Sequence, residues 1–173
     1  MSVRAFNGFT PKIGSSSWIA ENAVVTGDVI MGEDCCLLFH AVIRGDVNSI
    51  RIGDGTNIQD GAIIHGSTGG IDTTIGDNVS IGHRAIVHGC TIHNNVLIGM
   101  GAIVLDNVVV NENVVVAAGA MVSGGSVLES GFIYAGVPAK KLKKLSPEAM
   151  TQYIDTIATG YKSLSKKYKD EGF

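Results

Sequence analysis

The chain has 173 residues, enough for one domain with a sizeable hydrophobic core. Apolar residues make up 45% of the chain, which excludes a disordered protein, and a net charge of -3 gives no indication of a nucleic-acid partner. The apolar set is rich in Val, Ile and Ala, with 23 Gly and one Trp, a composition that favours strands and tight turns over a helical bundle.

The N-terminal residues and the cysteines indicate a cytoplasmic protein. Residues 1–10 lack a basic segment followed by an apolar stretch, and no apolar run approaches the length of a membrane span. The cysteines, Cys35, Cys36 and Cys90, are odd in number and two are adjacent, which does not fit a disulfide framework. We expect all three to be small apolar core residues, with Cys90 worth checking as a ligand because it lies near His88.

An aliphatic residue recurs every six positions from about Ile13 to about Leu128, as at Ile75, Ile81 and Ile98. A period of six fits neither one face of a helix nor the simple alternation of a flat strand. It fits short strands joined by tight turns, with the aliphatic side chains pointing inward. Three steps break the period: Ile43 to Ile52 and Ile64 to Ile75 are too long, and Val87 to Ile92 is too short.

This pattern resembles the hexapeptide-repeat family, whose members fold as a left-handed parallel β-helix with three short strands and about 18 residues per coil. The resemblance implies a mainly β fold of about six stacked coils. We expect a single domain over residues 1–173, with the β-helix over about 13–135 and a linker over about 136–145. A C-terminal amphipathic helix is expected over about 146–170.

The C-terminal segment changes from a period of six to helical spacing. Ser146 reads as an N-cap, followed by Pro147 at the first helical position. Apolar residues then recur at helical spacing, namely Met150, Ile154, Ile157, Tyr161, Leu164 and Tyr168. We expect this helix to pack back along the triangular prism that the β-helix forms. The alternative is a coiled-coil arm. The lysine-rich run over 140–144 is expected to be a solvated connection.

The irregular steps decide where the histidines point. If each overlong step is one strand plus an inserted loop, Ile43, Ile64 and Val87 lie on one face in successive coils. The residues that follow them would stack on that face, namely Arg44, His65 and His88. If the eleven-residue step is instead two strands with one deletion, His65 would share a face with His83. The pattern leaves both registers open.

In the first register His83 follows Ile81 on a different face, with Asp60 one coil away at the same offset. If three prisms pack around a threefold axis, His83 of one subunit can approach His65 and His88 of the next, giving three equivalent sites. Three neutral imidazoles with an open fourth position are typical of catalytic zinc. One such histidine alone would be interpreted as an ordinary polar surface residue. The other two histidines, His40 and His93, have no partners in register.

Several motifs together resemble the γ-class carbonic anhydrases, namely Arg44-Gly45-Asp46, Asn57-Ile58-Gln59-Asp60, His65, and His83 with His88. The resemblance implies a homotrimer in which His65 and His88 of one subunit and His83 of the next bind Zn²⁺, with Fe²⁺ or Co²⁺ as other candidate metals. It also implies that Gln59 contacts the metal-bound water or CO2. Arg44 and Asp46 would pair across or near the subunit interface, and Asp60 would support a ligand from behind.

The implied reaction is reversible hydration of CO2 to bicarbonate by a metal-bound hydroxide, a lyase activity. Two departures from the family pattern affect proton removal. Val47 stands where active members have an acidic residue, and the loop 66–70 carries no carboxylate before Asp72. Tyr134-Ala135-Gly136 occupies the region where members carry an Asn that lines the site. We therefore expect metal binding with slow hydration.

Three other functions compete with this reading. A hexapeptide acyltransferase would need only one catalytic histidine, so a set of three argues against it. A thioesterase-like hydrolase would use the same ligands on an acyl carbon. A metal-bearing structural subunit would turn nothing over. In each case we expect a small-molecule or protein partner, with neither nucleic acid nor membrane.

Overall fold

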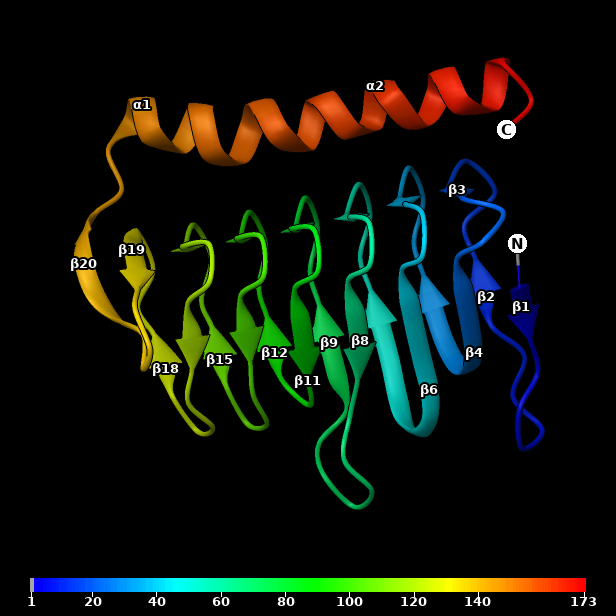
Figure 1. Cartoon of the computed structure of the whole chain (residues 1–173), viewed down its shortest axis with the longest axis horizontal. Helices are drawn as coiled ribbons and strands as arrows, with labels where there is room; N and C mark the ends of the chain where they lie inside the picture. The colour runs from blue at the N-terminus through cyan, green and yellow to red at the C-terminus, as the bar shows by residue number, and fades with distance from the viewer. Residues whose placement is uncertain (1) are drawn as a thin grey trace.

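The computed structural model describes residues 2–173 as a parallel β-solenoid with a helical segment along one side (Figure 1). One wall is an eight-stranded sheet with the order β20-β19-β16-β13-β10-β7-β5-β3. Its strands are β3 (Trp18–Ile19), β5 (Cys36–Leu37), β7 (Asn57–Ile58), β10 (Ser80–Ile81), β13 (Leu97–Ile98), β16 (Val115–Val116), β19 (Phe132–Ala135) and β20 (Lys140–Lys144).

The other two walls form one continuous 12-stranded sheet, because β4 and β6 run from one wall into the next. On the first of these walls lie the starts of β4 and β6 with β1 (Ser2–Arg4), β8 (Ile63–His65), β11 (Ile86–His88), β14 (Ile103–Val104) and β17 (Met121–Val122). The second holds their ends with β2 (Lys12–Ile13), β9 (Thr73–Ile75), β12 (Thr91–Ile92), β15 (Val109–Val110) and β18 (Val127–Leu128). The bounds of the long strands are β4 (Val24–Met31) and β6 (Val42–Ile52).

The solenoid has seven coils, because seven parallel strands stack in the eight-stranded sheet and only β20 is antiparallel. The sequence predicted about six. The additional coil ends in β19, which lies beyond Leu128, where the six-residue period stops being recognisable. The expected β-helix is otherwise confirmed.

The core is a set of stacked aliphatic columns. Ile58, Ile81 and Ile98 lie in register on successive coils, and each is fully buried. Burying a side chain of this size contributes roughly 1.5–3 kcal/mol, and each coil covers its neighbour, so the stack supplies most of the stability. The period of six thus exists because one inward position recurs on each short strand.

The two overlong steps have different structures. The nine-residue step is not a strand plus a loop, because β6 continues around the corner as an unbroken 11-residue strand paired to β4, with a shift in register. The eleven-residue step does contain a loop, residues 66–72, which projects from the prism (Figure 1). At other corners Asn residues adopt positive φ, as Asn78 does at 53°.

The lysine-rich run is a strand rather than an unstructured linker. Lys140–Lys144 forms β20, which pairs antiparallel with β19 and covers the open edge of the last coil. Lys141 makes an ion pair with Glu129 at 2.6 Å and lies over the Phe132 ring at 4.3 Å. The strand is exposed along its whole length, as charged edge strands commonly are.

The C-terminal helical segment packs back along the eight-stranded wall, as expected (Figure 1). It consists of α1 (Pro147–Met150), a π-helical turn η1 (Thr151–Asp155) and α2 (Thr156–Asp170). The Ser146 side chain accepts a hydrogen bond from the backbone N–H of Ala149, which confirms the predicted N-cap. Ile154 of η1 and Ala158 of α2 are the buried apolar side chains of this segment. In the described residues, no helix is both long and apolar enough to cross a bilayer.

Candidate metal centre

Two histidines, His65 and His88, lie together on one wall of the prism and are called the convergent pair below. His65 ends β8 and His88 ends β11, and the two residues are direct partners in the parallel ladder. Their ring centroids lie 5.2 Å apart, with Nδ1 of His65 3.2 Å from Nε2 of His88. The first register is therefore correct, and the alternative that placed His65 and His83 on one face is wrong.

Carboxylates fix which nitrogen of each ring carries the proton. Asp46 lies 3.1 Å from Nε2 of His65, and Asp106 lies 3.0 Å from Nδ1 of His88. A carboxylate only accepts, so each neutral ring donates its N–H outward and turns its lone pair toward the other ring. Two lone pairs 3.2 Å apart cannot hydrogen-bond to each other.

That spacing fits two ligands of a single metal ion. Zinc–nitrogen bonds are about 2.0–2.1 Å long, so two tetrahedral ligand nitrogens lie about 3.3 Å apart. A cation between the rings would satisfy both lone pairs at once, and the carboxylates behind the rings would hold them in place. In the chain as it stands, the guanidinium of Arg44 lies 3.3 Å from the same Nδ1 atom of His65 and can donate to it.

Arg44 lies beside this pair. Its guanidinium contacts Asp46 at 2.5 Å and Nδ1 of His65 at 3.3 Å, all within one chain. Burial, with the positive charge of Arg44, lowers the pKa of His65 and keeps the ring neutral. Burial would raise the pKa of Asp46, but hydrogen bonds from Arg44 and His65 outweigh it, and the pKa of Asp46 lies below its usual value.

Sequence reasoning missed Asp106. The short step after Val87 places Gly89 at the corner that faces this carboxylate, and a Cβ on Gly89 would lie 2.1 Å from the Oδ1 atom of Asp106. The glycine therefore clears the approach of Asp106 to His88. Asp106 also accepts a hydrogen bond from the Ser67 hydroxyl of the projecting loop at 3.4 Å.

The third histidine lies on a different wall. His83 follows β10, and its Nδ1 lies 2.8 Å from Oδ2 of Asp60, the carboxylate expected one coil away. Its side chain is 41% exposed, against 17% for His65 and 26% for His88. His83 is thus the most exposed of the three histidines, and it lies apart from the other two.

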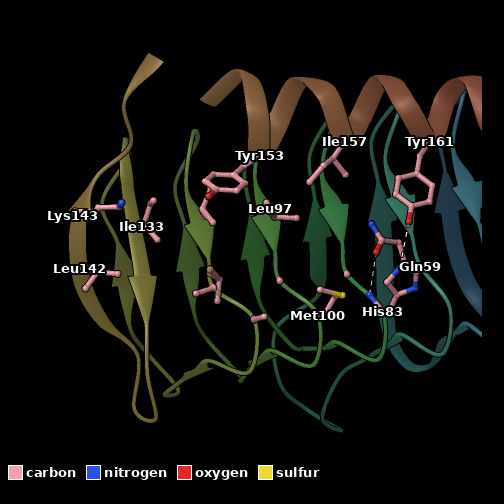
Figure 2. A pocket seen from close by; sticks show the side chains of 16 residues that line it. Gln59, His83, Leu97, Met100, Ile133, Leu142, Lys143, Tyr153, Ile157 and Tyr161 are labelled. Atoms are coloured by element: carbon pink, nitrogen blue, oxygen red, sulfur yellow. Dashed lines mark hydrogen bonds between the residues drawn. The ribbon is translucent and has the colours of Figure 1, made fainter. Parts of the chain in front are cut away.

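Gln59 and Tyr161 flank His83 (Figure 2). The Gln59 carbonyl oxygen accepts the backbone N–H of His83 at 3.2 Å, and its amide nitrogen donates to Asn57 at 3.0 Å. The Tyr161 hydroxyl, carried by α2, lies 3.4 Å from Nε2 of His83. The six-residue repeat predicts that Gln59 lies near His83. It does not predict that Tyr161 does, because the repeat says nothing of how the helix docks.

Within one chain the three histidines do not meet. Across residues 2–173, no group of three or more His, Cys, Asp or Glu side chains is close enough to hold a metal ion. Cys90 is buried in the core, which raises the pKa of its thiol to about 12, so it belongs to the packing, as do Cys35 and Cys36. His40 and His93 are exposed surface residues.

Comparison with known proteins identifies the family. The model of the bacterial transferase hexapeptide (six repeats) family matches residues 10–45 and 89–124. A carbonic anhydrase from Geobacillus kaustophilus is 38% identical over 95% of this chain and 89% of its own length. The chain belongs to the γ-class carbonic anhydrase-like family of hexapeptide-repeat proteins.

Two further relatives show how far this assignment reaches. Gamma carbonic anhydrase 1 of Arabidopsis thaliana mitochondria is 40% identical over 93% of this chain, which spans only 60% of that longer protein. The crystal structure of a hexapeptide transferase family protein from Anaplasma phagocytophilum is 40% identical, with a TM-score of 0.91 over 96% of this chain and 98% of that chain. The family is therefore clear, whereas the names of its members point to different reactions.

Proposed function

We propose that this chain is a metal-dependent, γ-class carbonic anhydrase-like lyase that interconverts CO2 and bicarbonate at sites shared between the subunits of a homotrimer. The observation that carries the proposal is the pair of facing lone pairs on His65 and His88. The half-exposed His83 then supplies the third ligand from a neighbouring subunit. Zn²⁺ suits three imidazoles best, with Fe²⁺ or Co²⁺ as the other metals.

When bound, such a metal lowers the pKa of a coordinated water to about 7 and so provides hydroxide at neutral pH. The residues of this chain supply the rest. Asp46, Asp60 and Asp106 each accept the N–H of one histidine and orient its ring. Gln59 is held between Asn57 and the backbone of His83, and its remaining amide N–H would donate to the metal-bound water or to CO2.

Proton removal is the weak step of the proposed cycle. Ser67 of the projecting loop donates to Asp106, Asn48 donates to the backbone carbonyl of Ser67, and Asp72 at the end of the loop accepts the backbone N–H of Ser49. No carboxylate precedes Asp72 within the loop. We expect the hydration rate to depend on added buffer, which would take over the transfer of the proton to solvent.

Complementation between two inactive variants tests the shared site. His83→Ala keeps the convergent pair, and His88→Ala keeps His83, so neither trimer alone contains a complete site. Unfolding, mixing and refolding the two in equal amounts should restore about one complete site in four, because a site needs the pair from one variant beside His83 of the other. Metal content and CO2 hydration should rise together.

His93→Ala replaces His88→Ala in the control mixture, because His93 is an exposed histidine outside the site. That mixture should bind more metal than the test mixture, since every neighbour pair with an intact His83 is competent. Stoichiometric metal in His83→Ala alone would contradict the proposed ligand set. Absence of recovered metal in the test mixture would contradict sharing between subunits.

A second candidate is a hydrolase that uses the same ligands on an acyl carbon. An apolar pocket lined by His83, Gln59 and Tyr161 favours it, because CO2 needs no such space. An acyltransferase has no comparable use for the lone-pair geometry of His65 and His88. For location we propose the cytoplasm, since the three cysteines are free and buried, as expected in a reducing compartment.

A further inference from the structure

A cavity of about 560 Å³ lies between the C-terminal helical segment and the wall formed by β10, β13, β16 and β19 (Figure 2). It extends from the coil of His83 to that of β19, three coil steps or about 14 Å, and on to the edge strand β20. Its lining is mostly apolar and includes Leu97, Met100, Val115, Ile133, Leu142 and Ile157. The volume lies within the range of pockets that bind small molecules, about 300–1,000 Å³.

One column of the prism changes from large to small residues beside the cavity. Leu38 and Gln59 occupy this column in two earlier coils, and Gly82, Gly99 and Ala117 occupy it in the next three. Gly82, Gly99 and Ala117 all line the cavity, and none carries a side chain larger than a methyl group that would fill it. The cavity has the chain's own helix as one wall, which distinguishes it from an open surface.

Polar groups gather at one end of the cavity. His83, Gln59 and Tyr161 lie together there, whereas Lys143 lies at the far end beside Ile133 (Figure 2). The Tyr161 hydroxyl lies 3.4 Å from Nε2 of His83 and can donate a hydrogen bond to a carbonyl oxygen placed there. Three polar groups at one end and a mostly apolar lining between them and Lys143 match a ligand with a polar head and an apolar chain.

The helix itself is irregular over the cavity. The π-helical turn η1 carries Tyr153, one of the lining residues, and interrupts an otherwise α-helical segment. Such turns are rare and are frequently found at functional sites.

We propose that this cavity binds the unbranched acyl chain of a carboxylic ester or thioester, with the carbonyl group at Gln59, His83 and Tyr161. The head group should be neutral, because Asp60 lies 2.8 Å from His83 and would repel a free carboxylate. The inference goes beyond the proposed CO2 hydration, and only its chemical step rests on the shared metal site of the proposed function. In that step water adds to the carbonyl carbon, the bond to the thiol or alcohol breaks, and the leaving group takes a proton.

Binding of octanamide to the metal-free protein, measured by calorimetry, tests the pocket without any turnover. Octanamide should bind and octanoate should bind roughly tenfold more weakly, because only octanoate is charged. Ala117→Leu should weaken octanamide binding at least about tenfold by filling the cavity. Ala5→Leu makes the same change at an exposed site far from the cavity and should bind as the wild type does.

If Ala117→Leu fails to fold, Ile157→Trp fills the cavity from the helix side. Equal octanamide affinity in wild type and either folded filling variant would overturn the assignment, and so would absence of binding to wild type. A filling variant that changes the subunit number would show instead that a second copy occupies the cavity. Octanamide binding without any metal uptake would support the pocket while contradicting the proposed function.

With metal bound, hydrolysis of octanoyl esters provides the functional arm. The ratio of kcat/KM for octanoyl over acetyl esters should exceed one in wild type and fall toward one in Ala117→Leu. CO2 hydration should be unaffected in that variant, because CO2 does not fill the cavity. An unchanged octanoyl preference would contradict the assignment of the acyl chain to this cavity.

Discussion

The convergent pair and His83 are built in opposite ways. His65 and His88 lie on one wall, are neighbours in a β-ladder and turn their lone pairs toward each other. His83 follows a strand of another wall, is the most exposed of the three, and has the Asp60 carboxylate and the Tyr161 hydroxyl near its ring. The ladder brings two imidazoles together within one chain, whereas the third stays apart from them at an exposed corner. In the proposed site, two subunits would therefore supply the three ligands.

The largest expected effect is loss of half of the convergent pair. His88→Ala should weaken metal binding more than 100-fold, beyond the roughly 10–100-fold typical of losing a supporting partner. Competition with a chelator of known affinity measures it, and His93→Ala is the matched control. Near wild-type affinity in His88→Ala would remove the pair from the site.

Next in size are the carboxylates behind the rings. Asp106→Asn and Asp60→Asn should each weaken metal binding roughly 10–100-fold, because an amide holds the ring less firmly in its ligand orientation. Asp170→Asn, at an exposed helical position, should leave affinity unchanged. An effect of Asp106→Asn without any effect of Asp60→Asn would separate the pair from His83 and argue against three equivalent ligands.

Gln59→Ala should retain metal but lower the hydration rate about tenfold, the value of one ordinary hydrogen bond. Because Gln59 is buried and bonded to Asn57, thermal unfolding must be measured beside stopped-flow hydration. Unchanged kcat in a folded variant would remove the role given to Gln59. Loss of metal would instead place Gln59 among the groups that hold His83.

The smallest effect is a pH dependence of the metal-free protein. Folding lowers the pKa of His65 below its usual value near 6.5, so between those two pKa values the unfolded chain binds more protons. Stability should therefore fall as the pH is lowered through about 6.5. Urea unfolding at pH 7 and pH 5.5 measures this, and His65→Asn should flatten the dependence. An equal slope in both proteins would assign it to other groups.

Much of the site follows from counting residues in the repeat. The register of His65 with His88, and of Asp60 with His83, is set by backbone ladders that the period reveals. Asp106 escapes such counting because the short step at Gly89 shifts its offset by one residue. The position of Tyr161 depends on how the helix docks, which no repeat encodes. The antiparallel pairing of β20 was hidden because its exposed lysines read as solvated chain.

The helical segment also changes how the molecule should unfold. A stack of coils that touch only their neighbours can fray from either end, like a one-dimensional array. Here Met150 packs near the last coil. At the other end, the ring of Tyr168 stacks on that of Trp18 in the first coil, with 4.4 Å between the ring centroids, and the Trp18 indole N–H donates to the carbonyl of Phe173. The segment therefore contacts both ends of the solenoid and connects them. Fraying at either end would first have to detach it, so the seven coils should melt as one cooperative unit rather than one by one.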